Sequence, residues 1–209
     1  EIMPRALFWF RWGAAWTWLT GVLLLQFVFW GAKITLKPEV GWSPVAILML
    51  ALVFVAPFLY DVLAKSIKDA KVFGAVAYVL LAIVICLMHW SGYSYRGYNI
   101  HLAAMLGTVM AWNVWFRIWP AQQKILRAVK EGTAPDAALV GMAGTRSRHN
   151  VYMSVPLLWG MINAHTSHFA GGNLGIEDAY AFVPYLVIIL VAWHVVWQLY
   201  KKAPTVKGF

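Results

Sequence analysis

Cysteine and charged residues are scarce in this sequence of 209 residues. The single cysteine, Cys86, excludes a disulfide framework within the chain, and without a C-x-x-C-H motif the usual covalent attachment of a c-type haem is excluded too. Only 12% of the residues are charged and 62% are hydrophobic, whereas the apolar share of soluble domains is roughly half. We therefore interpret the chain as an integral membrane protein, in which any haem would be bound non-covalently.

Long hydrophobic runs divide the chain into segments that could cross a bilayer, since about 20 helical residues span a hydrocarbon core of about 30 Å. We predict about six transmembrane helices, over residues 7–31, 44–62, 72–90, 98–119, 149–169 and 179–200. Gly and Pro residues punctuate the connections, and no segment has the composition of a separate soluble domain. The predicted fold class is therefore all-α, with residues 1–209 forming a single transmembrane helical domain.

Acidic residues are also few, with 8 Asp and Glu against 17 Lys and Arg. With six spans, every basic residue except Lys33, Lys37 and Arg96 falls on the side that holds both termini. Basic residues gather on the cytoplasmic side of membrane proteins, so we predict that both termini and a loop over residues 120–148 are cytoplasmic. The chain is then a multi-pass protein of the bacterial inner membrane. Its net charge of +9 reflects this topology and contact with anionic lipid, and we expect no nucleic-acid partner.

The six histidines are the main candidates for chemistry, because ionisable groups inside a bilayer are costly and commonly functional. His101 and His165 fall at matching depth in the fourth and fifth predicted helices, and a haem b between two helices needs one imidazole from each. We therefore predict His101 and His165 as ligands of haem iron. His168 and His89 lie at similar depth as substitutes or supporting hydrogen-bond donors, and His165 and His168 should share one helical face.

Other uses of the histidines stay open. His149 and His194 could hold a second haem toward the cytoplasmic side, although a polar cap beside Arg146 and Arg148 is the simpler interpretation of His149. Four clustered imidazoles could instead bind copper or zinc, or each histidine could only form hydrogen bonds with protein groups such as Asn163. We expect no carboxylate or lysine poised inside the membrane, which argues against hydrolysis and proton pumping.

Three stretches cover most of residues 7–165 and read, in order, LFWFRWGAAWTWLTGVLLL, HLAAMLGTVMAWNVWFRIWPAQQK and RSRHNVYMSVPLLWGMINAH. They resemble the membrane domain of the bacterial membrane-bound urate hydroxylases, also called the urate oxidase N-terminal domain family. The resemblance implies a multi-helix membrane domain that is usually followed by a c-type cytochrome domain. It also implies that electrons from urate pass toward a respiratory chain.

Several residues match the family motif by position. They are the histidines His101, His149 and His165 and the polar residues Asn113, Gln122, Arg146 and Asn150. The chain departs from the family at Phe8 and Gly13, where the family typically has His and Glu. Compared with the family, we also expect it to be N-terminally short and to lack the cytochrome c domain. The resemblance therefore does not by itself assign urate activity.

Together these features predict a membrane redox subunit of a respiratory-type complex, which is expected to bind haem b and to exchange electrons with a periplasmic c-type cytochrome. One alternative is a cofactor-free accessory subunit, packed against other membrane subunits of a larger oxidase or respiratory assembly. This alternative predicts that the histidines pair with protein groups. A further alternative is a urate hydroxylase-like oxidoreductase.

Overall fold

The computed structural model describes residues 2–170 and 173–206. Its α-helices are α1 (Ile2–Leu24), α2 (Pro44–Ser66), α3 (Ala70–Trp90), α4 (Tyr95–Asn113), α5 (Trp119–Lys130), α6 (Ala137–Asn163) and α7 (Val183–Lys202). The π-helical segment η1 (Leu25–Trp30) extends α1, and η2 (Val114–Ile118) joins α4 to α5 without a break. The described residues contain no β-strand, so the predicted all-α class is confirmed.

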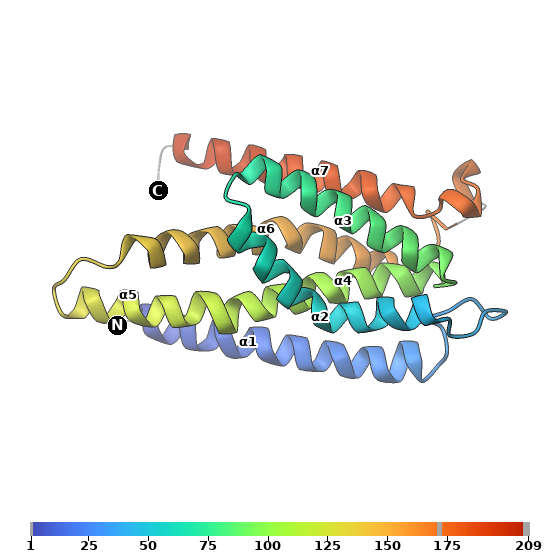
Figure 1. Ribbon diagram of the computed structural model, residues 1–209, viewed down its shortest axis with the longest axis horizontal. Helices are drawn as coiled ribbons and strands as arrows, with labels where there is room; N and C mark the ends of the chain where they lie inside the picture. The colour runs from blue at the N-terminus through green and yellow to red at the C-terminus, as the bar shows by residue number, and fades with distance from the viewer. Residues whose placement is uncertain (1, 171–172, 207–209) are drawn as a thin grey trace.

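Helices α4 and α6 make the most extensive contact in the bundle and form its centre. Figure 1 shows α1 on one side of this pair and α7 on the other. The start of α1, the connection from α2 to α3, the connection from α5 to α6 and the end of α7 all lie toward one end of the bundle, on the left in Figure 1. We call this the terminal end. The remaining connections lie at the other end, so the long helices alternate in direction.

Four helical segments are long and apolar enough to cross a membrane, namely Pro4–Trp30, Pro44–Ser66, Ala70–Trp90 and Asp178–Thr205. The prediction of six such spans is therefore wrong in number for the described part of the chain. The reason is that α4 and α6 carry polar side chains which the bundle buries, including His101 and Asn113 in α4 and Arg146 in α6. These side chains lower the apolar content of both helices, although they face protein and not the outside.

Apolar side chains cover much of the outer surface. Trp9 and Phe27 in the first helical segment are both 72% exposed, and Ile162 in α6 is 65% exposed. Soluble monomers rarely expose apolar patches of this extent. The surface therefore fits a protein embedded in a lipid bilayer.

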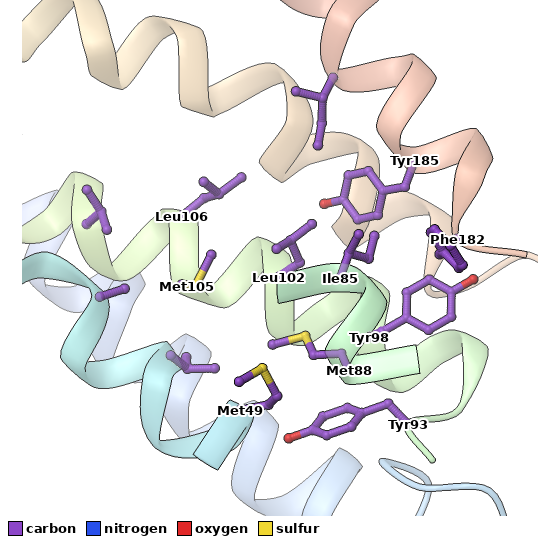
Figure 2. Packing of buried hydrophobic residues seen from close by; sticks show 14 of the residues in the cluster. Met49, Ile85, Met88, Tyr93, Tyr98, Leu102, Met105, Leu106, Phe182 and Tyr185 are labelled. Atoms are coloured by element: carbon purple, nitrogen blue, oxygen red, sulfur yellow. The ribbon is translucent and has the colours of Figure 1, made fainter. Parts of the chain in front are cut away.

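Figure 2 shows the apolar core, in which methionine, leucine and tyrosine side chains from α2, α3, α4 and α7 interlock. Tyr93, Tyr98 and Tyr185 are fully buried there, and each hydroxyl donates to a main-chain carbonyl of another segment at 2.9–3.0 Å. A buried hydroxyl needs such a partner. The tyrosines thus connect neighbouring segments of the bundle as well as filling its core.

The ends of α6 differ from the sequence prediction. Asp136 accepts a hydrogen bond from the Ala138 main-chain N–H at 2.8 Å and caps the helix there. Most of the predicted loop over residues 120–148 is therefore helical, in α5 and α6. At the other end, α6 stops at Asn163, so His165 and His168 follow the helix and the prediction that they share a helical face is wrong. No Gly or Pro stands between residues 164 and 170 to mark this end in the sequence.

Candidate functional site

Both ring nitrogens of His101 are engaged by protein groups. The Trp30 indole N–H donates to Nε2 at 2.9 Å, and Nδ1 lies 2.7 Å from the Gly97 carbonyl oxygen. Because an indole N–H can only donate and a carbonyl can only accept, the proton of His101 is on Nδ1. The side chain is fully buried beside the ring of Tyr93. In this arrangement His101 offers no free nitrogen to a haem iron.

The other predicted ligands lie in different surroundings. His165 and His168 are exposed. His89 is buried beside the rings of Tyr98 and Phe182. Within residues 2–170 and 173–206, which include all six histidines, no group of three or more His, Cys, Asp or Glu side chains could hold a metal ion. The clustered imidazoles that a copper or zinc site would need are therefore not found.

Replacing the partner of His101 tests its structural role. Trp30→Phe removes the donor to Nε2 and leaves a buried acceptor without a partner, which costs about 1–3 kcal/mol. Thermal unfolding of the purified protein in detergent should show this loss. The matched variant Trp90→Phe changes a side chain that is 71% exposed and should leave the unfolding temperature unchanged. Equal unfolding temperatures for the two variants would contradict a structural role for the Trp30 bond.

A polar cluster lies where the last turns of α2 meet α4, η2 and α6. Asp61, Asn113 and Arg146 are buried at its centre, whereas the Lys65 side chain is 62% exposed. We call the whole group the polar cluster, and its members are Tyr60, Asp61, Lys65, Asn113, Arg117, Arg146, His149 and Asn150. It contains an ionic part around Asp61 and a neutral part around Tyr60. The two parts touch, because the guanidinium of Arg146 also lies over the Tyr60 ring, 4.8 Å from its centroid.

The ionic part gathers three cations on one carboxylate. Arg117 donates to both carboxylate oxygens of Asp61, with its Nε at 2.7 Å from Oδ1. Arg146 Nη2 donates to Oδ1 at 2.9 Å, and Lys65 Nζ lies 2.7 Å from Oδ2. One negative charge against three positive charges leaves two positive charges in excess. The other amino nitrogen of Arg146, Nη1, is buried and has no hydrogen-bond partner in the described residues.

The neutral part is a chain of side-chain hydrogen bonds. The Tyr60 hydroxyl lies 2.8 Å from His149 Nδ1, and Asn113 Nδ2 donates to this hydroxyl at 3.1 Å and to Asn150 Oδ1 at 2.9 Å. The ring of Phe73 stacks on His149, with centroids 4.4 Å apart. Asn113 Oδ1 is buried and lacks a hydrogen-bond partner within the described ranges. Tyr60 is therefore flanked by two side chains that each keep an unpaired buried atom, a donor on Arg146 and an acceptor on Asn113.

Sequence reasoning identified only the α4 and α6 part of this cluster. His149 is not a helix cap, because α6 begins at Ala137. Its Nδ1 faces Tyr60, whereas His194 is exposed on α7 with Gln198 3.3 Å away, so the two histidines do not form the predicted pair.

Sequence reasoning did not identify the cluster residues on α2, which are Tyr60, Asp61 and Lys65. Asp61 lies in the predicted second span, 44–62, so the expectation of no carboxylate inside the membrane is wrong. A lone acid in that apolar run is the signal that could have found the site.

Comparison with known proteins places the chain in a family. The family model described as urate oxidase N-terminal matches residues 1–205. No curated protein and no solved structure matches the chain. The match covers nearly the whole sequence and includes every member of the polar cluster, so the resemblance predicted from the three stretches is confirmed. The chain belongs to the urate oxidase N-terminal family.

Proposed function

We propose that this chain is the membrane-embedded, substrate-binding part of a urate-oxidising oxidoreductase, and that the polar cluster binds urate. One observation carries the proposal. Asn113, Arg146, His149 and Asn150 match the family motif from separate parts of the sequence, and they meet in the polar cluster, where Asn113 and Arg146 are buried and His149 and Asn150 half-buried. Burying so many polar groups in an apolar bundle is costly, and such groups commonly mark a functional site.

The chemistry of the cluster suits urate. Urate is a planar anion at neutral pH, and its rings carry amide C=O and N–H groups side by side. Arg146 Nη1 can donate to a ring carbonyl, and Asn113 Oδ1 can accept from a ring N–H. The two excess positive charges favour an anion, and a charged donor such as Arg strengthens each hydrogen bond to it.

The oxidation of urate releases two electrons, which a further redox component of the assembly must take up. We propose a c-type cytochrome partner for this step. Haem b is not part of the proposal, because both nitrogens of its predicted ligand His101 are bonded within the protein.

We place the protein in the bacterial inner membrane with its terminal end in the cytoplasm. The basic residues Lys65, Lys68, Lys71 and Lys130 lie in or beside the connections at that end, as the positive-inside rule expects of a cytoplasmic side. In this orientation α1, α2, α3 and α7 shield the buried polar side chains of α4 and α6, such as Asn113 and Arg146, from lipid.

Urate-dependent reduction of added cytochrome c by membranes that contain the native full-length protein tests this function. We expect reduction only when urate is present. His149→Phe keeps a ring that can stack on Phe73 but removes both nitrogens, and it should lower the rate at least tenfold. The control His194→Phe changes an exposed histidine and should leave the rate unchanged. A wild-type rate of cytochrome c reduction that does not depend on urate would contradict the proposal.

A second candidate function is a cofactor-free accessory subunit. It is favoured by the pairing of His101 with Trp30 and of His149 with Tyr60, since this alternative predicts that histidines bond to protein groups. It differs from the first proposal in expecting no response to urate in the same membranes. It also expects that removing the chain lowers the amount of a co-purifying membrane complex.

A further inference from the structure

We infer that Tyr60 is a positioning residue that holds His149 in the tautomer with its proton on Nε2. His149 then presents an N–H donor, and not a lone pair, at Nε2. The use of this donor on urate rests on the proposed function. The assignment of the tautomer itself follows from the direction of four hydrogen bonds.

The direction of the chain is set at the Met110 main-chain carbonyl, which can only accept. Asn150 lies 3.2 Å from this oxygen and must turn its amino group toward it. Asn150 Oδ1 therefore faces Asn113, 2.9 Å away, and the Asn113 amino group must donate to it. The second N–H of the same amino group points to the Tyr60 hydroxyl oxygen at 3.1 Å. Each hydrogen bond determines the direction of the next one, so the orientations of the Asn150 and Asn113 amides are both determined.

The last step fixes the histidine. The Tyr60 oxygen accepts from Asn113, and its single O–H has no other acceptor within the described residues, so it donates to His149 Nδ1 at 2.8 Å. An Nδ1 atom that accepts carries no proton, and the proton of the neutral ring is then on Nε2. Stacking on Phe73, with the two rings only 14° from parallel, holds the plane of the imidazole.

This tautomer determines what His149 can do. Metal or haem ligation through Nε2 needs the lone pair that the proton occupies, which also explains why His149 is unsuited to the predicted haem pair with His194. A fixed N–H donor instead stabilises negative charge on an oxygen of a bound anion without having to reorient. We therefore assign His149 the role of hydrogen-bond donor to urate at the polar cluster, with Tyr60 holding it in place.

His101 supplies an internal reference, because its proton is on the other nitrogen. The full-length protein with ¹⁵N-labelled histidine, studied by NMR at about pH 8, above the ordinary imidazole pKa of about 6.5, distinguishes the two tautomers. The signals are assigned with His149→Gln and His101→Gln. We expect an unprotonated Nδ1 and a protonated Nε2 for His149, and the reverse for His101.

Asn113→Asp reverses the hydrogen-bond chain and gives the sharpest test. The new carboxylate can only accept, so it takes the Tyr60 O–H, and the Tyr60 oxygen then accepts from His149. We expect the His149 proton to move to Nδ1 in this variant. Tyr60→Phe should remove the preference and give both tautomers. The control Asn163→Asp alters another buried asparagine of the bundle and should leave His149 unchanged.

The His101 signals report whether each variant keeps its fold. Unchanged His101 signals together with an unmoved His149 proton in Asn113→Asp would overturn the inference, as would a protonated Nδ1 on His149 in the wild type. If Asn113→Asp fails to fold, the wild-type and Tyr60→Phe spectra decide the question. The expected tautomer without any urate-dependent activity would overturn the proposed function and the donor role toward urate, but not the tautomer. Urate-dependent activity with a protonated Nδ1 would overturn this inference alone.

Discussion

Asp61→Asn is expected to destabilise the protein by about 3–5 kcal/mol, the cost of breaking a buried ion pair from one side. Asp61 is the only carboxylate that contacts Arg117, Lys65 and Arg146 in the described residues. The Arg146 side chain is only 4% exposed, so water cannot solvate the guanidinium that loses its partner. Thermal unfolding in detergent should show a decrease of about 10 °C, since 1 kcal/mol corresponds to roughly 2–4 °C in a chain of this size.

Two comparisons show whether the burial of Asp61 and Arg146 causes this loss of stability. Asp178→Asn breaks the Lys37–Asp178 pair, in which Asp178 is 63% exposed, and should cost no more than about 1 kcal/mol. The double variant Asp61→Asn with Arg146→Gln should lose less stability than the sum of the two single variants, because the buried cation is removed with its partner. If Asp61→Asn unfolded at the same temperature as Asp178→Asn, the Asp61–Arg146 pair would not be buried as described.

Gly160→Ala is expected to cost about 3 kcal/mol, near the upper end for overpacking. A Cβ atom at Gly160 would press against the Tyr185 hydroxyl and lie 2.7 Å from the Asn99 carbonyl oxygen and 3.0 Å from Ala103 Cβ. Small residues allow helices to approach this closely, and here α4, α6 and α7 meet. The added methyl group must push the helices apart, because one of the atoms it meets belongs to the main chain.

Gly141→Ala is the matched control in the same helix. A Cβ atom at Gly141 meets no atom within 4 Å, so the substitution should be neutral or stabilise by up to about 1 kcal/mol through helix propensity. The difference between the two variants is measured by thermal unfolding of both in the same detergent. Gly160→Ala with the stability of Gly141→Ala would show that the helices are not in close contact at this point.

The positions of most long helices could be predicted from the sequence because apolar runs of sufficient length have few other folds in lipid. The exceptions are α5 and the start of α6, which fall in the predicted loop over residues 120–148. Hydropathy alone misjudged α4 and α6, whose polar side chains are buried in the bundle. It also placed the end of α6 too late, because nothing in the sequence from His165 to Phe169 breaks a helix. Helix ends without a Gly or Pro depend on contacts that a linear pattern does not contain.

The site was harder to predict, because its contacts join distant parts of the chain. Tyr60 meets Asn113 and His149 across 53 and 89 positions. The motif residues of α4 and α6 were found, but their partners on α2 lie at the end of an ordinary apolar run. The predicted haem ligand His101 illustrates the same limit, since the Trp30 donor that occupies its Nε2 lies 71 positions away.

A high-resolution structure of the intact protein prepared with urate tests the central claim most directly. We predict planar density against Tyr60, in contact with Arg146 Nη1 and Asn113 Oδ1 and within hydrogen-bonding distance of His149 Nε2. Planar density between His101 and His165, with the hydrogen bonds of the polar cluster unchanged and Trp30 turned away from His101, would contradict the account and support a haem site in its place.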